Sequence, residues 1–173
     1  MNITDKNASH LPVFEFLYSL KKFEKVMEFG CGLYSTSFFI RNAKSILSIE
    51  QKSKAWFEKI SKECGSSSLD IRFIPGEESV RWLKKHKKKY DLIFVDGIVR
   101  TDCVNNSFGK APIIVIHDIG LRAIKLGYLK QIVPNDYAFG FMNISHPSTS
   151  LWIKDDDLMK KVKNHKLFHL VKS

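Results

Sequence analysis

The sequence predicts an α/β fold in which two layers of helices enclose a mostly parallel β-sheet. Short apolar runs alternate along the chain with longer amphipathic stretches, as in a series of β-α-β units. The run Leu92–Val95 is continuously apolar, which is typical of a strand buried on both faces of a parallel sheet. With 173 residues, the chain is long enough for one domain with a full hydrophobic core.

Each expected element follows from its hydrophobic spacing. Apolar residues at helical spacing predict an opening helix over 11–23. Strands are expected at 26–29, 45–49, 71–74, 92–95 and 112–116, with helices that begin near 34 and span 53–64, 78–86 and 121–132. Residues 137–144 and 151–153 are expected to pair antiparallel and close the sheet, whereas the tail from 156 fits either a basic helix or a last short strand. The single domain 1–173 thus divides into an N-terminal helical segment (1–23), a core (26–153) and a basic tail (156–173).

Composition and charge exclude several classes of protein. Hydrophobic residues make up 44% and charged residues 27%, which excludes collagen-like, low-complexity and disulfide-dense chains. The three cysteines show no CxxC spacing, and no apolar run approaches the roughly 20 residues of a membrane-spanning helix. The N-terminal residues lack the pattern of a signal peptide, so we expect a cytoplasmic protein. The formal net charge of +10 is a weak indication of an acidic or phosphorylated partner.

The first motif is a glycine turn after the first predicted strand. Gly30 and Gly32 let the backbone turn tightly and approach a ligand, and the helix behind them offers free N–H groups to a carboxylate or phosphate. A dinucleotide-binding fingerprint would place a third glycine where this chain has Ser35. The acid Glu28, two residues before the turn, suits a ligand that carries an ammonium group. A purely structural glycine turn is the alternative.

Two further candidates follow the second and third predicted strands. Glu50 stands at a strand end, where a carboxylate can accept both ribose hydroxyls of an adenosine. A solvated strand-end acid is the alternative. Gly76 and Glu77 form a turn that can approach an adenine edge, yet they fit equally well at the start of a helix, because the helix dipole favours acids there.

Polar residues also follow the fourth and fifth predicted strands. Asp96 ends one apolar run, where its carboxylate can orient a hydroxyl, take its proton or hold a divalent cation, and Arg100 lies within reach to bind an acidic substrate. His117 and Asp118 end the next run, and a histidine with an ordinary pKa near 6.5 suits a general base at neutral pH. A hydrogen-bonded structural histidine is the alternative. Because the carboxyl ends of parallel strands share one edge of a sheet, we expect a ligand cleft there.

Taken together, these segments resemble the class I S-adenosylmethionine-dependent methyltransferases of the Rossmann type. The matching pieces are, in the family's order, Glu28-Phe29-Gly30-Cys31-Gly32, Glu50, Asp91-Leu92-Ile93-Phe94-Val95-Asp96-Gly97 and Ile116-His117-Asp118. The last two pieces are similar to a subgroup of small O-methyltransferases, several of which act on sugars or polyketides. The resemblance runs from about residue 26 to 119, with weaker agreement to 153.

The resemblance implies a Rossmann-like three-layer sandwich with a seven-stranded sheet and S-adenosylmethionine over the ends of strands one, two and four. The cofactor residues that it implies are Glu28, Gly30 and Gly32 for the methionine part, Ser35 and Thr36 for its carboxylate, Glu50 for the ribose, the Gly76-Glu77 turn for the adenine, and Asp96 beside them. Relatives that bind Mg²⁺ use acids after strands four and five, which Asp96 and Asp118 match. Ile119 stands where the last metal ligand belongs, so Mg²⁺ or Mn²⁺ is only a secondary expectation.

We therefore expect O-methyl transfer from S-adenosylmethionine to a hydroxyl. His117 is the expected base, Asp96 is expected to orient either this base or the acceptor, and Asp118 is the third candidate catalytic residue. The acceptor site is expected to come from the segment before 23, a loop over 98–110 and the stretch after 118. So short a chain leaves little sequence for a capping domain, and an open site suits an extended acceptor such as a sugar or glycan.

Three other interpretations remain open. An RNA methyltransferase is motivated by the net charge and by the basic run 84–89, which also fits a solvated helix end. An NAD-dependent oxidoreductase is disfavoured by Ser35 in place of the third glycine. A non-catalytic adenosine-binding or interaction module would keep the turn and the acids without the chemistry.

Overall fold

The computed structural model describes residues 8–117, 136–142 and 149–170. The strands are β1 (Lys25–Phe29), β2 (Ser45–Glu50), β3 (Leu69–Phe73), β4 (Leu92–Val95), β5 (Ile113–Ile116), β6 (Ala138–Met142), β7 (Thr149–Ile153) and β8 (Phe168–Leu170). The helices are α1 (Leu11–Leu20), α2 (Leu33–Asn42), α3 (Lys54–Glu63), α4 (Gly76–Lys85), α5 (Arg100–Ser107) and α7 (Asp156–Val162).

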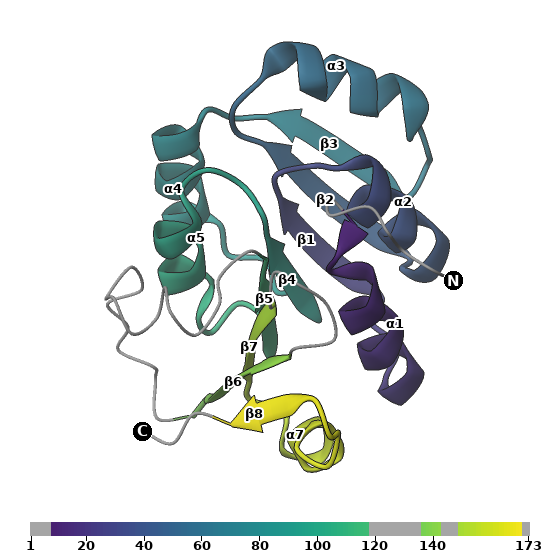
Figure 1. Ribbon diagram of the computed structural model, residues 1–173. Coiled ribbons are helices and arrows are strands. Elements are labelled where there is room, and N and C mark those ends of the chain that lie inside the picture. The colour runs from purple at the N-terminus through teal and green to yellow at the C-terminus, as the bar shows by residue number, and fades with distance from the viewer. Residues whose placement is uncertain (1–7, 118–135, 143–148, 171–173) are drawn as a thin grey trace.

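The strands form one sheet in the order β3-β2-β1-β4-β5-β7-β6-β8 (Figure 1). β1 to β5 pair in parallel, and β6, β7 and β8 run antiparallel to their neighbours. The α/β fold, the mostly parallel sheet and the antiparallel C-terminal pair are thereby confirmed. Over the described residues the sheet has eight strands instead of seven, because the tail contributes both a helix, α7, and an edge strand, β8.

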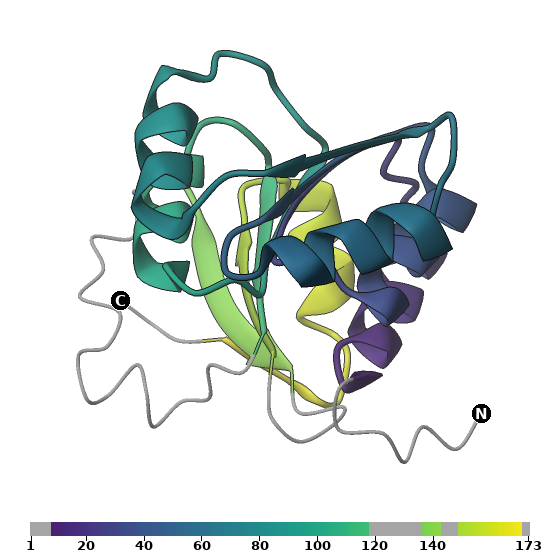
Figure 2. The ribbon, with the colours of Figure 1, turned by 90° about the horizontal axis from the view of Figure 1, so that it is seen from above.

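Helices cover both faces of the sheet, as Figure 2 shows from above. α1, α2 and α7 share one buried apolar cluster with one face, and α4 and α5 share another with the opposite face. β4 shows why its sequence is continuously apolar: Leu92 and Phe94 belong to the first cluster, and Ile93 and Val95 belong to the second. All four side chains are fully buried, so neither face of the strand tolerates a polar residue.

One helix lies where a loop was expected. α5 occupies most of 98–110, although its sequence, RTDCVNNS, is rich in residues of low helix propensity. It buries Cys103, Val104 and Ser107, and it packs against α4, β4 and β5. Tertiary packing therefore decides this helix, and no strong apolar periodicity announces it. The helix predicted at 121–132 and the end of the strand predicted at 137–144 lie outside the described residues.

The strand order determines where a ligand can bind. It reverses between β1 and β4, so that the chain leaves β1 toward β2 on one side and reaches β4 on the other. In open α/β sheets a crevice forms at the carboxyl ends of the strands at such a point. Among the described helices, none is both long and apolar enough to cross a membrane.

Candidate active site

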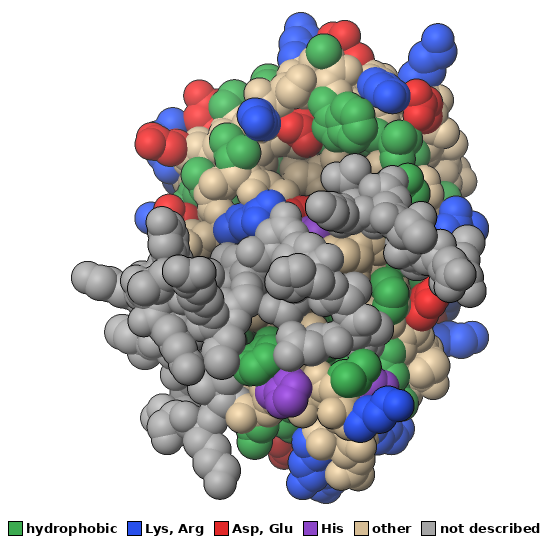
Figure 3. Space-filling view, in the orientation of Figure 1, with side chains coloured by type: hydrophobic (Ala, Val, Ile, Leu, Met, Phe, Trp, Pro, Cys, Tyr) green, Lys and Arg blue, Asp and Glu red, His purple; other side chains and the backbone are tan. Residues whose placement is uncertain are grey.

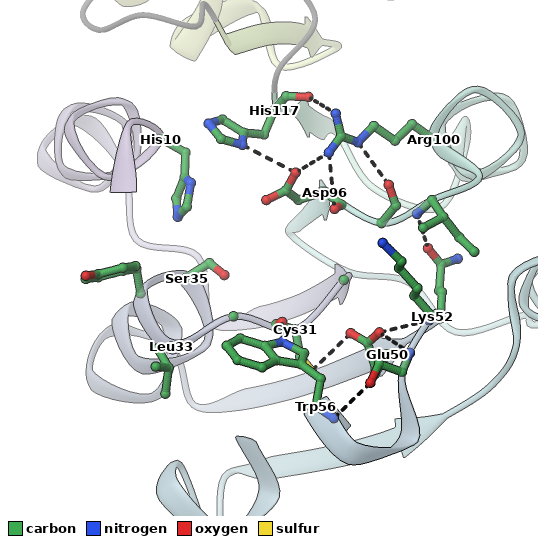
Figure 4. A pocket seen from close by; sticks show the side chains of 17 residues that line it. His10, Cys31, Leu33, Ser35, Glu50, Lys52, Trp56, Asp96, Arg100 and His117 are labelled. Atoms are coloured by element: carbon green, nitrogen blue, oxygen red, sulfur yellow. Dashed lines mark hydrogen bonds and ion pairs between the residues drawn. The ribbon is translucent and has the colours of Figure 1, made fainter. Parts of the chain in front are cut away.

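A cavity of about 680 Å³ lies at the carboxyl edge of the sheet (Figure 4). Its walls come from the ends of β1, β2, β4 and β5, from the first turn of α2 and from the segment before α1. This is the edge at which the strand order predicts a crevice. A cavity of this volume holds a small molecule of cofactor size.

The residues expected from the sequence divide between the cavity wall and the structure behind it. Those on the wall are Gly30, Gly32, Ser35, Glu50, Asp96, Arg100 and His117. Those described but not on the wall are Glu28, Thr36, Gly76 and Glu77. Asp118 lies outside the described residues, and so does the metal pair that it was expected to form with Asp96.

The glycine turn is held between β2 and β4. The Gly30 N–H donates to the Ile49 carbonyl over 2.8 Å, and the Asp96 N–H donates to the Phe29 carbonyl over 2.8 Å. Gly30 has φ +83°, and a Cβ there would lie 2.7 Å from the Asp96 carbonyl carbon and oxygen. Only glycine fits this position, because a side chain would meet both a strained backbone and rigid main-chain atoms.

Glu28 supports the glycine turn from behind and does not reach the cavity. Its carboxylate accepts hydrogen bonds from the hydroxyls of Thr36 and Ser48, each over 2.6 Å. Thr36 Oγ1 in turn accepts the Gly32 N–H over 3.0 Å. Burial raises the pKa of Glu28 from 4.5 to about 7, and the hydroxyl hydrogen bonds oppose part of that rise. Glu28 and Thr36 thus hold the turn from behind, and their expected contacts with the cofactor stay a prediction.

Glu50 presents a fixed carboxylate to the cavity. Its Oε1 accepts the N–H groups of Lys52 and Ser53 over 2.8 and 3.0 Å, and the Cys31 thiol donates to Oε2 over 3.4 Å. Trp56 lines the same end of the cavity, where its indole N–H donates to the Cys31 carbonyl over 2.7 Å. This end thus combines an orientated anion with a flat aromatic ring. No sequence motif points to Trp56, which lies in the first turn of α3.

Gln51 lines the cavity, whereas the turn after β3, which was expected to approach an adenine, does not. Its Oε1 accepts the Ile98 N–H over 3.2 Å, and its Nε2 donates to Ser79 Oγ over 2.6 Å. Gly76 is buried against Ile98 and lies outside the cavity wall, and Glu77 is exposed in the first turn of α4. The helix-start interpretation of Gly76 and Glu77 therefore describes their position, and Gln51 binds the neighbouring loop.

Asp96, Arg100 and His117 form the opposite end of the cavity (Figure 4). Arg100 donates to Asp96 Oδ1 over 2.7 Å and to the carbonyls of Gly97 and His117 over 2.9 and 3.2 Å. It joins the ends of β4 and β5, and its expected contact with an acidic substrate stays a prediction. His117 Nδ1 lies 3.3 Å from Asp96 Oδ1.

His10 also lines this end of the cavity, and no sequence motif points to it. It precedes α1 and is buried, with its ring centroid 4.8 Å from that of His117. Burial and the proximity of His117 lower the pKa of His10 from 6.5 to about 4, which Asp96 partly opposes. A lone histidine in an unpatterned N-terminal segment carries no functional signal. Only the packing of α1 beside the sheet brings it to the cavity.

Comparisons with known proteins bear on the fold. No protein-family model matches the sequence, and no curated protein is significantly similar to it. A putative caffeoyl-CoA O-methyltransferase from Staphylococcus aureus superposes with a TM-score of 0.61 at 14% identity, over 88% of this chain and 85% of its own. A methyltransferase of Podospora anserina bound to S-adenosylhomocysteine gives 0.62 at 15%, over 88% and 80%. The N-methyltransferase NodS of Bradyrhizobium japonicum gives 0.58 at 10%, over 83% and 91%.

These three proteins share the architecture of this chain at identities too low to carry substrate or residue roles across. Two of them differ in the atom named in their description, oxygen in one and nitrogen in the other, so the shared property is the fold. In this chain the strand order reverses between β1 and β4, and the cavity lies at the carboxyl edge where open α/β sheets form a crevice. The chain has the fold of the class I S-adenosylmethionine-dependent methyltransferases.

Proposed function

We propose that the protein is an S-adenosylmethionine-dependent O-methyltransferase whose acceptor is a carbohydrate hydroxyl. The observation that carries the proposal is the division of one cavity into two ends. Glu50 and the glycine turn stand at one end, and Asp96 and His117 stand at the other. The first end suits an adenosine with a charged amino-acid tail, and the second suits a hydroxyl that must lose a proton.

The cofactor end fits the group that the fold implies. Glu50 is held by two backbone N–H groups, so its remaining acceptor capacity faces the cavity, where ribose hydroxyls can donate to it. The turn at Gly30 and Gly32 brings backbone to the wall without side chains. Trp56 offers an apolar ring beside Glu50. Each of these features favours an adenosine ligand over a small anion.

The acceptor end provides for proton removal. S-adenosylmethionine supplies a methyl group on a sulfonium sulfur, so that transfer to oxygen leaves a neutral thioether. Asp96, whose side chain is 24% exposed, orients the acceptor hydroxyl, and the buried imidazole of His117 beside it is the base. Alignment of the reactants contributes on the order of 7–11 kcal/mol, and proton removal adds about 10²–10⁴-fold in rate. The side chains here are polar, which favours a sugar over an apolar acceptor.

An RNA acceptor is less well supported. The lysines at 87–89 immediately precede β4, so they lie at the amino edge of the sheet, opposite the cavity. On the face that Figure 3 shows, Lys and Arg side chains lie in separate places, with Asp and Glu side chains among them. A strand of RNA would need a continuous basic path to the cavity.

Calorimetry tests the cofactor assignment with a matched pair of variants. We expect the wild-type protein to bind S-adenosylmethionine and S-adenosylhomocysteine and not NAD. Glu50→Gln should weaken this binding by about 10–100-fold, because a charge-assisted hydrogen bond is lost. Glu77→Gln, which removes an exposed carboxylate outside the cavity, should change it less than about twofold. Binding of NAD alone, or equal effects of the two substitutions, would contradict the proposal.

Methyl transfer is tested separately with a labelled methyl group. The acceptors are a panel of glycans and monosaccharides, with RNA as the comparison. His117→Ala should retain cofactor binding and lose transfer to the glycan that the wild-type protein methylates. Transfer to RNA alone would replace the acceptor class, and cofactor binding without transfer to any acceptor would favour a non-catalytic module.

A further inference from the structure

Three side chains that commonly bind metals converge at the acceptor end of the cavity. His10 precedes α1, Asp96 follows β4 and His117 follows β5, so the three come from segments far apart in the sequence. One ligand atom from each lies within 4.8 Å of the other two. Both imidazoles are buried, and all three side chains line the cavity (Figure 4).

The hydrogen bonding of His10 is incomplete. Its side chain is 2% exposed, and neither ring nitrogen has a hydrogen-bond partner among the described residues. A buried polar group without a partner destabilises the fold, so such groups are rare in proteins. His10 also lies edge-on to His117, so two basic rings share one small buried space. A metal ion between the rings would accept one nitrogen lone pair from each of them.

His117 already has the hydrogen bond that a metal-bound histidine usually makes. Its Nε2 lies 2.6 Å from Ser9 Oγ, which can accept the ring N–H and so leave the lone pair on Nδ1. Nδ1 is the nitrogen that lies 3.3 Å from Asp96 Oδ1. Ligating histidines commonly donate their other ring N–H to a neighbouring oxygen, which fixes the tautomer and the ring orientation.

We propose that His10, Asp96 and His117 bind a divalent transition-metal ion, with an open coordination position toward the cavity. Ligand atoms about 2.0–2.2 Å from a tetrahedral ion lie about 3.3 Å from one another, the separation that His117 and Asp96 already have. The three ligand atoms lie within 4.8 Å of one another, so His10 moves toward the ion when the site closes. Two imidazoles and one carboxylate select Zn²⁺, Co²⁺ or Fe²⁺ over Mg²⁺, which prefers oxygen ligands only.

Arg100 is compatible with an ion at this position. It donates to Oδ1 of Asp96, and because a carboxylate oxygen has two lone pairs, Oδ1 can accept from Arg100 and bind an ion at the same time. Carboxylates that bind metals are in turn hydrogen-bonded by neighbouring donors. Arg100 also contacts the carbonyls of Gly97 and His117, so it fixes the backbone on which two of the ligands stand.

The role of the ion rests on the proposed function, whereas its binding rests on the ligand geometry alone. An acceptor hydroxyl in the open position would coordinate the ion and lose its proton to solvent more readily, as metal-bound water does. His117 then acts as a ligand instead of as the base. This site differs from the one that the sequence suggested, because two of its three ligands are nitrogens and one comes from the segment before α1.

Metal binding tests the proposal without cofactor, acceptor or activity. Chelator-treated protein is titrated with Zn²⁺ and Co²⁺ by calorimetry, and Co²⁺ is also followed by its visible absorption, which intensifies in tetrahedral nitrogen coordination. We expect one ion per chain, no comparable binding of Mg²⁺ and, for His10→Ala, a loss of more than about 100-fold in affinity. His169→Ala, which removes an exposed histidine on β8, is the matched control and should bind as the wild-type protein does.

A second variant covers the case in which His10→Ala does not fold. Ser9→Ala keeps all three ligands and removes only the partner of His117, so it should weaken Co²⁺ binding by about 10-fold and shift the absorption spectrum. Equal affinity in His10→Ala and His169→Ala, an unchanged spectrum in Ser9→Ala, or no binding of Zn²⁺ and Co²⁺ by the wild-type protein would overturn the proposal. S-adenosylmethionine binding with no metal binding would refute the metal site alone, and the reverse result would refute the proposed cofactor.

Discussion

Replacing Gly30 with alanine tests how closely β1 and β4 approach at the cavity. Two costs are expected. The residue has φ +83°, and an alanine in the left-handed region costs about 1–2 kcal/mol. Its Cβ would also lie 2.7 Å from the Asp96 carbonyl and the Gly97 nitrogen, which are backbone atoms that cannot rotate away. Forcing these apart adds about 1–3 kcal/mol, so the total is about 2–5 kcal/mol.

Gly109→Ala is the matched control for this substitution. Gly109 has φ +72°, and a Cβ there would meet nothing within 4 Å. It should therefore lose only the about 1–2 kcal/mol of backbone strain. Urea unfolding followed by circular dichroism measures both free energies, and calorimetry measures S-adenosylmethionine binding. Gly30→Ala should also weaken binding, because it displaces Asp96 at the cavity, whereas Gly109 is not on the cavity wall. If the two variants differ by less than about 0.5 kcal/mol, the argument from close approach is refuted.

Three further substitutions test side chains whose hydrogen bonds hold the cavity in shape. Burial raises the pKa of Glu28 to about 7, so its contribution to stability is fully present below the ordinary pKa of 4.5 and is lost as pH rises through 7. Over this pH range the free energy of unfolding of the wild-type protein, measured in urea, should fall by about 3 kcal/mol. Glu28→Gln should not show this fall, because the amide does not titrate. Gln51→Leu should lower the free energy of unfolding by about 1–3 kcal/mol, because the Ile98 N–H loses its acceptor. Leucine has a similar shape, so an unchanged free energy of unfolding in this variant would contradict the hydrogen-bond role of Gln51. Arg100→Lys should lower the rate of methyl transfer while the affinity for S-adenosylmethionine stays constant, since a lysine cannot reach the three acceptors that Arg100 joins. A loss of cofactor affinity with an unchanged rate of transfer would contradict the placement of Arg100 at the acceptor end.

Strand-end residues could be predicted because the topology follows from the hydrophobic pattern. Once parallel strands are recognised, their carboxyl ends must share one edge, and Gly30, Glu50, Asp96 and His117 fall there without any knowledge of packing. The same reasoning placed Glu28 at the ligand, although it is one strand position short of the edge and points to the hydroxyls that hold the turn. A pattern gives the order of residues along a strand, and only the packed sheet shows which of them is covered.

Residues outside the repeating units were not predictable. Gln51 and Trp56 both follow β2, in segments whose sequences are typical of an ordinary turn and helix. Their side chains form hydrogen bonds with residues that are distant in the sequence. α5 likewise has no strong pattern and is stabilised by what it packs against. Long-range contacts of this kind produce no local sequence pattern, because the two partners do not stand at a regular spacing along the chain.

The amino-acid sequence alone determined the fold class and the edge of the sheet at which the cavity lies. Hydrophobic periodicity and glycine turns are local properties, so both can be read before the chain is folded. Tertiary structure decided what stands at that edge: it covered Glu28, tied Arg100 to the strand ends and brought His10 beside His117 and Asp96. The arrangement of the acceptor end brings His10 to residues more than 80 positions later in the sequence, and only the folded chain sets those distances.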